Sequence, residues 1–415
     1  MVSFSDLGLS EAFLRTLSQL HIHEPTDIQE KTIPLGLAGK DVIGCSATGS
    51  GKTLAFGAGL IENLRHGEGI QSLILAPTRE LAEQVGVSLQ KFARHTKLHT
   101  AIIYGGVGMA PQIDALERAD IVVGTPGRIL DHLERGSFRL SKIKVLILDE
   151  ADRMLDMGFI EDVTHIIEAC PRDRQTLLFS ATISPDIAHI AQRYMKSPSE
   201  VSAGERVDPS KLVQTFYDVP KHLKFSLLVH LLKQEKRGLV MVFCNTRHNA
   251  DFVATHLKAN GVQALAIHGG LTQSRRNRIM EIFRTNEFYV LVCTDVAARG
   301  LDIKGVSHVY NYDLPPNSKE YIHRIGRTAR AGSEGKALSL VSDRDYDNFR
   351  MVLRDDTLKI EQTPVPELEP IQLRIERRSS FRGGGRGRPF DSRRGSGRSS
   401  GRYGSRGSFG RGRGR

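Results

Sequence analysis

Short apolar runs recur along residues 1–203 and are separated by amphipathic stretches. They hold Val, Ile and Leu at successive rather than alternate positions, which predicts strands buried on both faces of a helix-covered parallel sheet. The stretches between them, such as 79–94 and 184–195, predict helices. The runs are DVIGC (41–45), SLILA (72–76), TAIIY (100–104), DIVVG (120–124), VLILD (145–149) and TLLFS (176–180).

A second series of the same kind follows a polar segment, 204–213, that contains Gly and Pro and predicts a linker. The pattern therefore predicts an α/β chain with two tandem parallel-sheet domains, residues 1–203 and 214–360. The similarity of the two halves is architectural, without a recognisable sequence repeat. The second-series runs are LVMVF (239–243), VQALAI (262–267), YVLVC (289–293), VSHVYNY (306–312) and KALSLV (336–341).

The end of the chain has a different composition. Residues 361–376 are rich in Pro and Glu and predict an extended segment. Residues 377–415 contain thirteen Arg and one acid, Asp391, a net charge of +12 against +11 for the whole chain of 415 residues, so the body is nearly neutral at −1. This tail is mostly Arg, Gly and Ser, and we expect it to be disordered because it has too few apolar groups to offset the entropy of ordering.

Composition also excludes several classes of protein. The chain has no apolar run of 18 residues, so no membrane span is expected. Its first residues, MVSFSDLGLSEAF, lack the pattern of a signal peptide. The four cysteines stand far apart, which favours buried thiols and a cytoplasmic location over disulfides or a metal site.

Candidate chemistry begins at Ser46-Ala47-Thr48-Gly49-Ser50-Gly51-Lys52-Thr53, between a predicted strand and a predicted helix. Glycines let the backbone N–H groups of such a loop turn toward phosphate oxygens. Lys52 would place a positive charge on the β- and γ-phosphates, and the Thr53 hydroxyl can bind Mg²⁺. Given its position, we favour a phosphate-binding loop over a simple glycine-rich turn.

Adjacent acids follow the strand VLILD, in the tetrad Asp149-Glu150-Ala151-Asp152. At the carboxyl end of a buried strand they would lie at the same sheet edge as the phosphate loop. Asp149 is predicted to face Mg²⁺ and Glu150 to activate the attacking water. An acid pair buried there also needs a cationic partner.

With these motifs the chain resembles a DEAD-box ATP-dependent RNA helicase with two RecA-like domains, and the resemblance extends over residues 4–345. It implies an RNA-stimulated ATPase with ATP and Mg²⁺ as cofactors and RNA as partner. It also implies an adenine-reading segment, Pro25 to Gln29, with Gln29 and Thr26 near the nucleotide. Phe4 either stacks on the adenine ring or is plain core packing. The family usually has glycine where His21 stands.

The resemblance assigns further residues to RNA backbone contacts and to coupling. Ser180 and Thr182 of Ser180-Ala181-Thr182 would link the acidic tetrad to the domain interface. Hydroxyls, glycine amides and Arg side chains at strand ends bind phosphate without reading sequence. The predicted RNA contacts are Pro77, Thr78, Arg79, Gly105, Gly106, Thr125, Pro126, Arg128, Thr246, Arg247, Gly269, Gln273, Arg276 and Thr294.

The second half contributes the segment His323 to Arg330, in which three arginines stand at i, i+3 and i+6, near one helical face. By the resemblance, Arg327 and Arg330 are arginine fingers for the γ-phosphate, and Asp302 contacts the ribose. A solvated basic helix, or one paired with acids, is the alternative.

ATP and RNA would each bind both domains, so that closure of the cleft couples their affinities, and a bent RNA path would open a few base pairs. An ATP-gated RNA clamp or protein-displacing scaffold shares every one of these motifs and stays an alternative. A DNA helicase or translocase with related domains is a third function, against which the acidic tetrad and Gln29 argue. The Arg/Gly-rich tail, with Phe381, Phe390, Tyr403 and Phe409, favours non-specific RNA capture over a merely solubilising role.

Overall fold

The computed structural model describes residues 2–46, 49–202, 212–235, 238–285, 290–298, 303, 305–329 and 334–371. They belong to one compact unit, Met1–Ile371. Thr48, Arg330, Asp302, most of the predicted linker and the Arg-rich tail lie outside the described residues. None of the helices in the described ranges has both the length and the apolar character needed to cross a membrane.

The first lobe is a seven-stranded, all-parallel sheet with strand order β3-β4-β2-β5-β6-β1-β7. All six predicted strands are present. The strands are β1 (Val42–Cys45), β2 (Ser72–Leu75), β3 (Thr100–Ile103), β4 (Ile121–Gly124), β5 (Val145–Leu148), β6 (Gln175–Ser180) and β7 (Ser199–Ser202). The helices are η1 (Phe4–Leu7), α1 (Glu11–Gln19), α2 (Asp27–Leu37), α3 (Lys52–Asn63), α4 (Arg79–Phe92), α5 (Ala110–Leu116), α6 (Pro126–Glu134), α7 (Ala151–Asp156), α8 (Ile160–Ala169) and α9 (Pro185–Tyr194).

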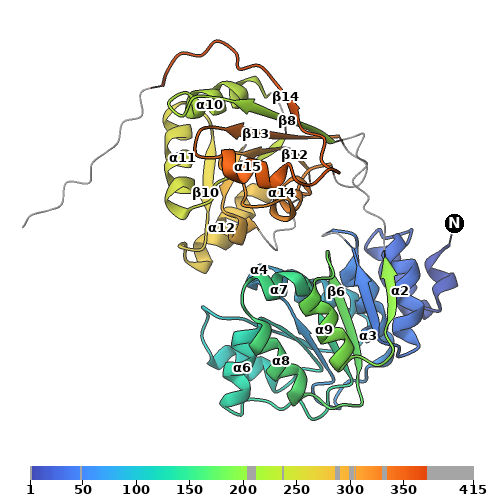
Figure 1. The fold of residues 1–415 in the computed structure, drawn as a ribbon. Helices are drawn as coiled ribbons and strands as arrows, with labels where there is room; N and C mark the ends of the chain where they lie inside the picture. Colours follow the sequence, from blue (N-terminus) through green and yellow to red (C-terminus); the bar gives the residue numbers. More distant parts are fainter. Residues whose placement is uncertain are drawn as a thin grey trace, which may run out of the picture. The chain divides into compact units, whose positions relative to one another are not determined.

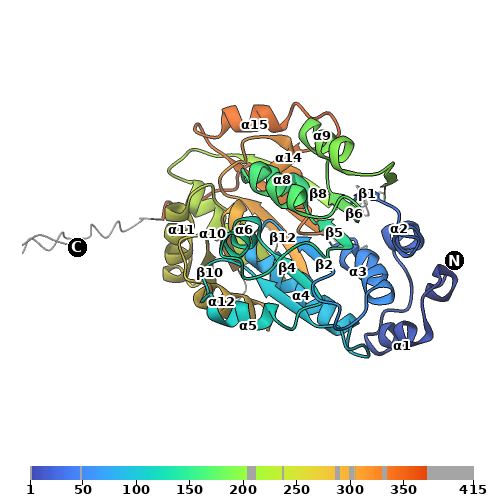
Figure 2. The same cartoon turned by 90° about the horizontal axis from the view of Figure 1, so that it is seen from below.

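Helices cover both faces of this sheet, which is why its strands are apolar at successive positions. Along β5, Ile147 packs into a core with α2, α3 and α4, whereas Leu146 and Leu148 pack into a second core with α6, α8 and α9. Figure 2 shows α8 and α9 on one side of the strands and α3 and α4 on the other. The double burial holds the strand ends rigidly in place, and the predicted motifs stand at those ends.

The second lobe repeats the architecture, again with all neighbouring strands parallel, in the order β10-β11-β9-β12-β13-β8-β14 (Figure 1). Its five predicted strands are confirmed. The strands are β8 (Leu212–Asp218), β9 (Leu239–Phe243), β10 (Ala264–Ile267), β11 (Val290–Cys293), β12 (Val306–Asn311), β13 (Gly335–Val341) and β14 (Glu361–Gln362). The helices are α10 (Lys224–Gln234), α11 (Arg247–Ala259), α12 (Gln273–Arg284), α13 (Asp295–Ala298), α14 (Ser318–Ile325) and α15 (Tyr346–Val352).

Three further strands were not predicted, because they lack a continuous run of apolar residues. Strand β7 has two exposed residues, β14 is only two residues long, and β8 begins at Leu212, inside the segment expected to be a linker. All three lie at or next to a sheet edge, where one face meets solvent and the run of apolar residues is interrupted. Each extends its sheet on the same side, so the two lobes have equivalent strand orders.

Candidate nucleotide and RNA site

The phosphate loop leads from β1 into α3, as predicted. Gly51 has φ +95° and precedes the helix, and a Cβ atom there would lie 2.3 Å from Nε2 of Gln29, so the position requires glycine. Lys52 is buried, and its ammonium donates to the carbonyl oxygen of Ser46 at 3.1 Å. The lysine is thus folded onto the loop that is expected to hold the phosphates.

Gln29 is tied to this loop. Its Oε1 accepts from the Thr26 amide at 2.9 Å, and its Nε2 donates to the Gly51 carbonyl at 3.0 Å. The Thr26 hydroxyl donates to the Ser50 carbonyl at 2.8 Å. The Gln29 amide has a second lone pair and a second N–H, so this side chain can read an adenine edge without breaking either bond. The segment therefore connects base recognition to the shape of the phosphate loop.

The structure also shows the surroundings of Phe4 and the backbone of His21. Phe4 is 4% exposed and packs in the core of the first lobe, which agrees with core packing rather than with a ring presented to a nucleotide. His21, where the family has glycine, has a left-handed backbone with φ +56°. That conformation is costly for a residue with a Cβ atom and explains why glycine is usual there.

The acid pair after β5 is buried, as the sequence predicted, and it has cationic neighbours. The Glu150 carboxylate accepts from Arg153 at 2.7 Å, and both side chains are nearly inaccessible. Burial raises the pKa of Asp149 to about 6, against the attraction of nearby Lys52, and its Oδ1 has no hydrogen-bond partner. An orphaned, buried carboxylate oxygen at this edge is suited to a hard cation such as Mg²⁺.

Glu150 itself has a strained backbone with φ +53°. Such conformations cost on the order of 1–3 kcal/mol and persist where the surrounding structure over-determines them. Here Glu150 stands between the end of a buried strand and the first turn of α7, whose Arg153 and Met154 amides donate to its carbonyl. In this conformation the Glu150 carboxylate pairs with Arg153. A cationic partner was predicted from the sequence, but its identity was not.

Ser180 and Thr182 connect the acidic tetrad to the phosphate loop. The Ser180 hydroxyl accepts from the Asp152 amide at 3.3 Å and donates to the Thr182 carbonyl at 2.7 Å. The Thr182 hydroxyl donates to the Asp152 carboxylate at 3.3 Å, and the Ser180 carbonyl accepts from the Ser46 amide at 3.0 Å. This chain of bonds provides a physical route from the nucleotide loop to the strand end that carries Thr182.

Predicted RNA-contact residues come together in the first lobe. The Thr78 hydroxyl caps α4 by accepting from the Leu81 amide, which places Arg79 in the first turn. The Arg79 guanidinium lies against Gly105 and Gly106, after β3, and a Cβ atom on Gly106 would lie 2.1 Å from it. Thr125 precedes α6, which starts at Pro126, and Arg128 donates to the Val107 carbonyl at 3.2 Å.

The second lobe repeats this pattern at its own sheet edge. Thr246 caps α11 by accepting from the Asn249 amide at 3.0 Å. Arg247 then lies against Gly269 and Gly270, with its guanidinium within 3.5–3.7 Å of the position of a Cβ atom on Gly269. Thr294 follows β11 and is buried. The equivalent residues of both lobes thus form a Thr-Arg pair over a Gly-Gly pair.

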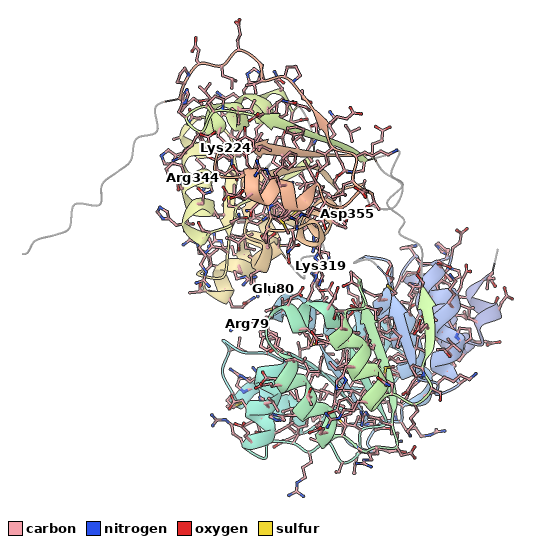
Figure 3. All side chains as sticks on the ribbon, in the orientation of Figure 1. Arg79, Glu80, Lys224, Lys319, Arg344 and Asp355 are labelled. Atoms are coloured by element: carbon pink, nitrogen blue, oxygen red, sulfur yellow. The ribbon has the colours of Figure 1, made fainter. Side chains whose placement is uncertain are left out.

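Two of the predicted RNA contacts bind a carboxylate of the first lobe. This carboxylate belongs to Glu80, which lies next to Arg79 on α4 (Figure 3). It accepts from Gln273 at 3.2 Å and pairs with Arg276 at 2.9 Å. Lys319 of α14 similarly donates to Asp156 of α7 at 3.2 Å. Phosphate binding by Gln273 and Arg276 therefore has to compete with Glu80.

The expectation that the arginines of this segment share one helical face is wrong for Arg327. Helix α14 ends at Ile325 with Gly326 as its C-cap, so Arg324 is helical and Arg327 stands in the turn that follows. Arg324 is 1% exposed and pairs with both oxygens of Asp295, at 2.6 and 2.7 Å, and with Asn245 at 2.9 Å. Its guanidinium also donates to the Asp313 carbonyl at 2.6 Å. This arginine therefore follows the alternative of pairing with acids, and its partners stand just after β9, β11 and β12.

His323, beside these arginines, is half-buried. Burial, together with the nearby Arg153 cation, lowers its pKa to about 4, so the imidazole is neutral at pH 7. Its Nδ1 has no hydrogen-bond partner. A neutral imidazole near the acidic tetrad is suited to donate or accept one hydrogen bond, not to supply charge. Arg327 is 4% exposed, so an arginine finger at this position has to be turned toward its ligand.

Fold and site together define a class: a two-lobed α/β protein with a glycine loop and a buried acid pair in the first lobe and a Thr-Arg pair at the carboxyl edge of each sheet. Residues 26–190 match the DEAD/DEAH box helicase family, and residues 223–332 match the helicase conserved C-terminal domain. Two bacterial relatives are each called CshA, a DEAD-box ATP-dependent RNA helicase of Bacillus cereus and an ATP-dependent RNA helicase of Listeria monocytogenes. They are 43% and 44% identical over 89% and 90% of this chain and 71% of each relative.

Solved structures of DEAD-box proteins are also similar to this chain. Dbp5 of S. cerevisiae bound to RNA and ADP BeF3 is 32% identical, with a TM-score of 0.78 over 88% of this chain and 96% of that one. A DEAD box protein of the hyperthermophile Methanococcus jannaschii is 42% identical, with a TM-score of 0.54 over 88% and 99%. The chain belongs to the DEAD-box ATP-dependent RNA helicase family, and its two lobes are RecA-like domains.

Proposed function

We propose that this protein is an RNA-dependent ATPase that locally unwinds short RNA duplexes, or remodels RNA–protein complexes, as its RecA-like domains close. The observation that carries the proposal is the distribution of residues between lobes. The phosphate loop and the acid pair belong to residues 1–203, and the buried Arg327 belongs to residues 214–360, the domain boundaries that we propose. Neither lobe is complete without the other.

In the first lobe, Lys52 exchanges its bond to the Ser46 carbonyl for the β- and γ-phosphates of ATP. Thr53 and Asp149 hold Mg²⁺, which neutralises charge between these phosphates when bound. Glu150 leaves Arg153 to orient and deprotonate the attacking water. Gln29 and Thr26 read the adenine, and Asp302 contacts the ribose. The bonds of Gln29 and Thr26 to loop carbonyls tie adenine reading to the phosphate loop.

In the second lobe, Arg327 and Arg330 neutralise the charge that develops on the γ-phosphate. Neutral His323 adds one hydrogen bond near the tetrad. Ser180, Thr182 and Asp152 transmit the state of the nucleotide to the lobe interface through the bonds that link them to Ser46.

RNA binds along the carboxyl edges of both sheets through its backbone. Arg79 and Arg247, each lying over a glycine pair, and the capped helix N-termini provide sequence-independent phosphate contacts. A strand that contacts both edges favours the closed arrangement that ATP also favours, so the two affinities are coupled. The Arg-rich tail 377–415 captures RNA non-specifically. We propose a cytoplasmic location and name no protein partner.

ATP hydrolysis should be measured with poly-RNA, with single-stranded DNA and without nucleic acid, for the wild-type protein and Lys52→Ala. We expect strong stimulation by RNA, little by DNA and none in Lys52→Ala. Equal stimulation by DNA would favour the DNA helicase, and RNA-independent turnover would contradict the proposal. A duplex-release assay beside a dwell-time assay separates unwinding from the RNA-clamp alternative, which predicts long RNA residence with little strand release.

A further inference from the structure

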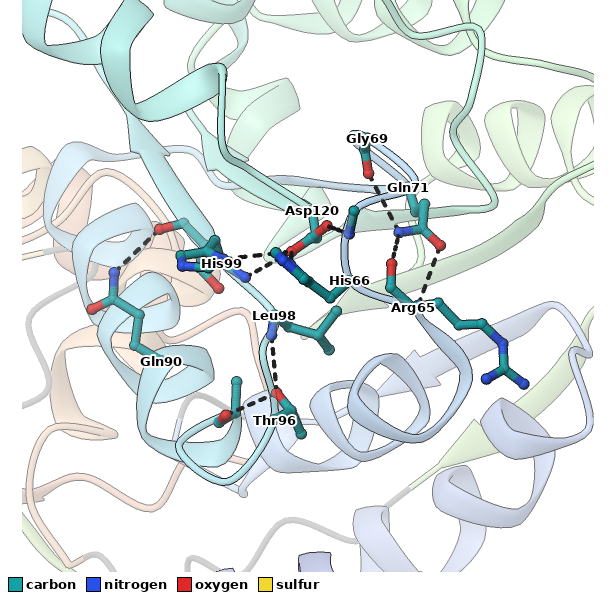
Figure 4. Close-up of polar contacts among 12 residues, drawn as sticks. Arg65, His66, Gly69, Gln71, Gln90, Thr96, Leu98, His99 and Asp120 are labelled. Atoms are coloured by element: carbon teal, nitrogen blue, oxygen red, sulfur yellow. Dashed lines mark hydrogen bonds and ion pairs between the residues drawn. The ribbon is translucent and has the colours of Figure 1, made fainter.

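A cluster of metal-ligand atoms lies at the opposite edge of the first sheet from the nucleotide residues. His66 belongs to the segment between α3 and β2, His99 immediately precedes β3, and Asp120 immediately precedes β4. These are the amino ends of three neighbouring strands, in the sheet order β3-β4-β2. Figure 4 shows both histidines converging on the aspartate.

The distances suit coordination of a single ion. One ligand atom from each of the three residues lies within 4.8 Å of the other two, a set found once in the part of the chain that the structure describes. The Oδ2 atom of Asp120 is 3.0 Å from Nδ1 of His66 and 3.8 Å from Nδ1 of His99. Ligands of a tetrahedral Zn²⁺ are separated by about 3.3 Å, which these two distances bracket.

The carboxylate is already oriented by the backbone. Asp120 is 2% exposed, its Oδ1 accepts from the Gly67 amide at 2.9 Å, and its Oδ2 accepts from the His99 amide at 2.9 Å. Such outer hydrogen bonds fix a ligating carboxylate and tune its affinity. The two imidazoles are 43% and 57% exposed, so an ion can enter from solvent and keep a water molecule as its fourth ligand.

We propose that His66, His99 and Asp120 form a binding site for a divalent transition metal of the Zn²⁺ type. Two imidazole nitrogens and one carboxylate favour Zn²⁺ or a similar ion over Mg²⁺ or Ca²⁺, which prefer all-oxygen sets. The ion would replace the hydrogen bond between His66 and Asp120. It would join the loops before β2, β3 and β4, and so stabilise the edge of the sheet far from the ATP chemistry.

The test is Zn²⁺ titration of the full chain, freed of metal by a chelator, by calorimetry, with Co²⁺ as a spectroscopic probe of tetrahedral coordination. We expect one Zn²⁺ per chain, and His99→Ala and His66→Ala should each weaken binding about tenfold or more. His165→Ala, an exposed histidine of α8, is the matched control and should bind as the wild type does. Both cluster histidines are surface residues, so these variants should retain the fold, which circular dichroism checks.

Thermal unfolding adds a second readout. Zn²⁺ should raise the unfolding temperature of the wild-type protein and of His165→Ala but not that of His99→Ala, because only a ligand that binds the folded state stabilises it. The proposal is overturned if the wild type binds no Zn²⁺ at millimolar concentration. It is equally overturned if all variants bind Zn²⁺ alike, since the ion then lies elsewhere. Neither outcome bears on the ATPase assignment.

Discussion

The two lobes have equivalent strand orders, yet the equivalent strand ends carry different residues. After β1 the chain forms the glycine loop and Lys52, whereas after the equivalent β8 it passes through Pro220 into α10. After β5 stand Asp149 and Glu150, whereas after the equivalent β12 stands Tyr312, followed by an aspartate that accepts from the Asn245 amide. The same strand order is thus followed by different residues at the strand ends of the two lobes.

What the lobes share is the Thr-Arg pair over a Gly-Gly pair. Capped helix N-termini at the carboxyl edge of a parallel sheet bind phosphate by geometry alone, so either lobe can carry them. The proposed hydrolysis additionally needs a buried lysine, an acid pair and a metal, and the lysine and the acids stand at the ends of β1 and β5, which flank β6 in the sheet. The difference teaches that capped helix N-termini can recur at the carboxyl edge of either sheet, whereas the buried charges belong to particular strand ends.

The largest effect is expected from Arg327→Ala, which should lower RNA-stimulated kcat by about 10³-fold or more by removing charge neutralisation from the transition state. Steady-state hydrolysis at saturating RNA measures it. Arg350→Ala, on exposed α15, is the control. If Arg327→Ala hydrolyses ATP at the wild-type rate, the second lobe contributes RNA binding only, and the proposed division of catalytic residues between the lobes is contradicted.

Next is Glu150→Gln, which should lower kcat by about 10²–10⁴-fold because the neutral amide cannot take a proton from water. Binding of ATP and RNA should persist, as measured by fluorescence titration. Glu161→Gln, exposed at the start of α8, is the matched control. If Glu150→Gln hydrolyses ATP at the wild-type rate, the acid pair is not what distinguishes the lobes.

Arg79→Ala and Arg247→Ala test the shared feature. Each should weaken RNA affinity by up to about tenfold and reduce the slope of log affinity against log salt by about one, because one phosphate contact is lost. Arg344→Ala, exposed on the second lobe, should change neither. Equal losses would sharpen the comparison, and a loss from only one of the two variants would show that only the lobe with that arginine uses this pair to bind RNA.

A pH dependence follows from the raised pKa of Asp149, about 6 in the folded protein against 3.8 ordinarily. The folded state holds this proton more tightly, so the stability of the nucleotide-free protein should fall as pH rises from about 4 to 6, and Asp149→Asn should remove that fall. Affinity for ATP with Mg²⁺ should instead weaken as pH falls below 6, since the ionised carboxylate holds the metal. Denaturant unfolding and nucleotide titration across this range measure both, and an unchanged profile in Asp149→Asn would contradict the assignment.

The smallest effect is expected from His21→Gly. Relief of the left-handed backbone should stabilise the protein by about 0.5–1 kcal/mol, after the greater chain entropy of glycine is counted. His23 lies two residues further along the chain and does not have a positive φ, so His23→Gly should destabilise the protein. Chemical denaturation measures both, and stabilisation by both variants would assign the effect to something other than φ.

Much of the fold could be predicted from sequence, because strands buried on both faces must be apolar at successive positions. β7, β8 and β14 were not predicted, because each lies at or beside a sheet edge and has exposed positions. Among site residues, Lys52 and Asp149 could be predicted from their order along the chain. The pairing of Arg153 with Glu150, and the burial of Arg324 against Asp295, depend on distances that residue order does not contain.

The sequence by itself determined the two-lobed α/β architecture, the nucleotide loop and acid pair of the first lobe, and the recurrence of Thr-Arg and Gly-Gly motifs. These depend on local patterning and on the rule that parallel strands end at one edge. Only the tertiary structure decided which charges neutralise one another, which backbones are strained, and that His66, His99 and Asp120 meet. Residues separated by 33 and 21 positions along the chain come together there because β3, β4 and β2 are neighbours in the sheet, an order that the linear sequence does not display.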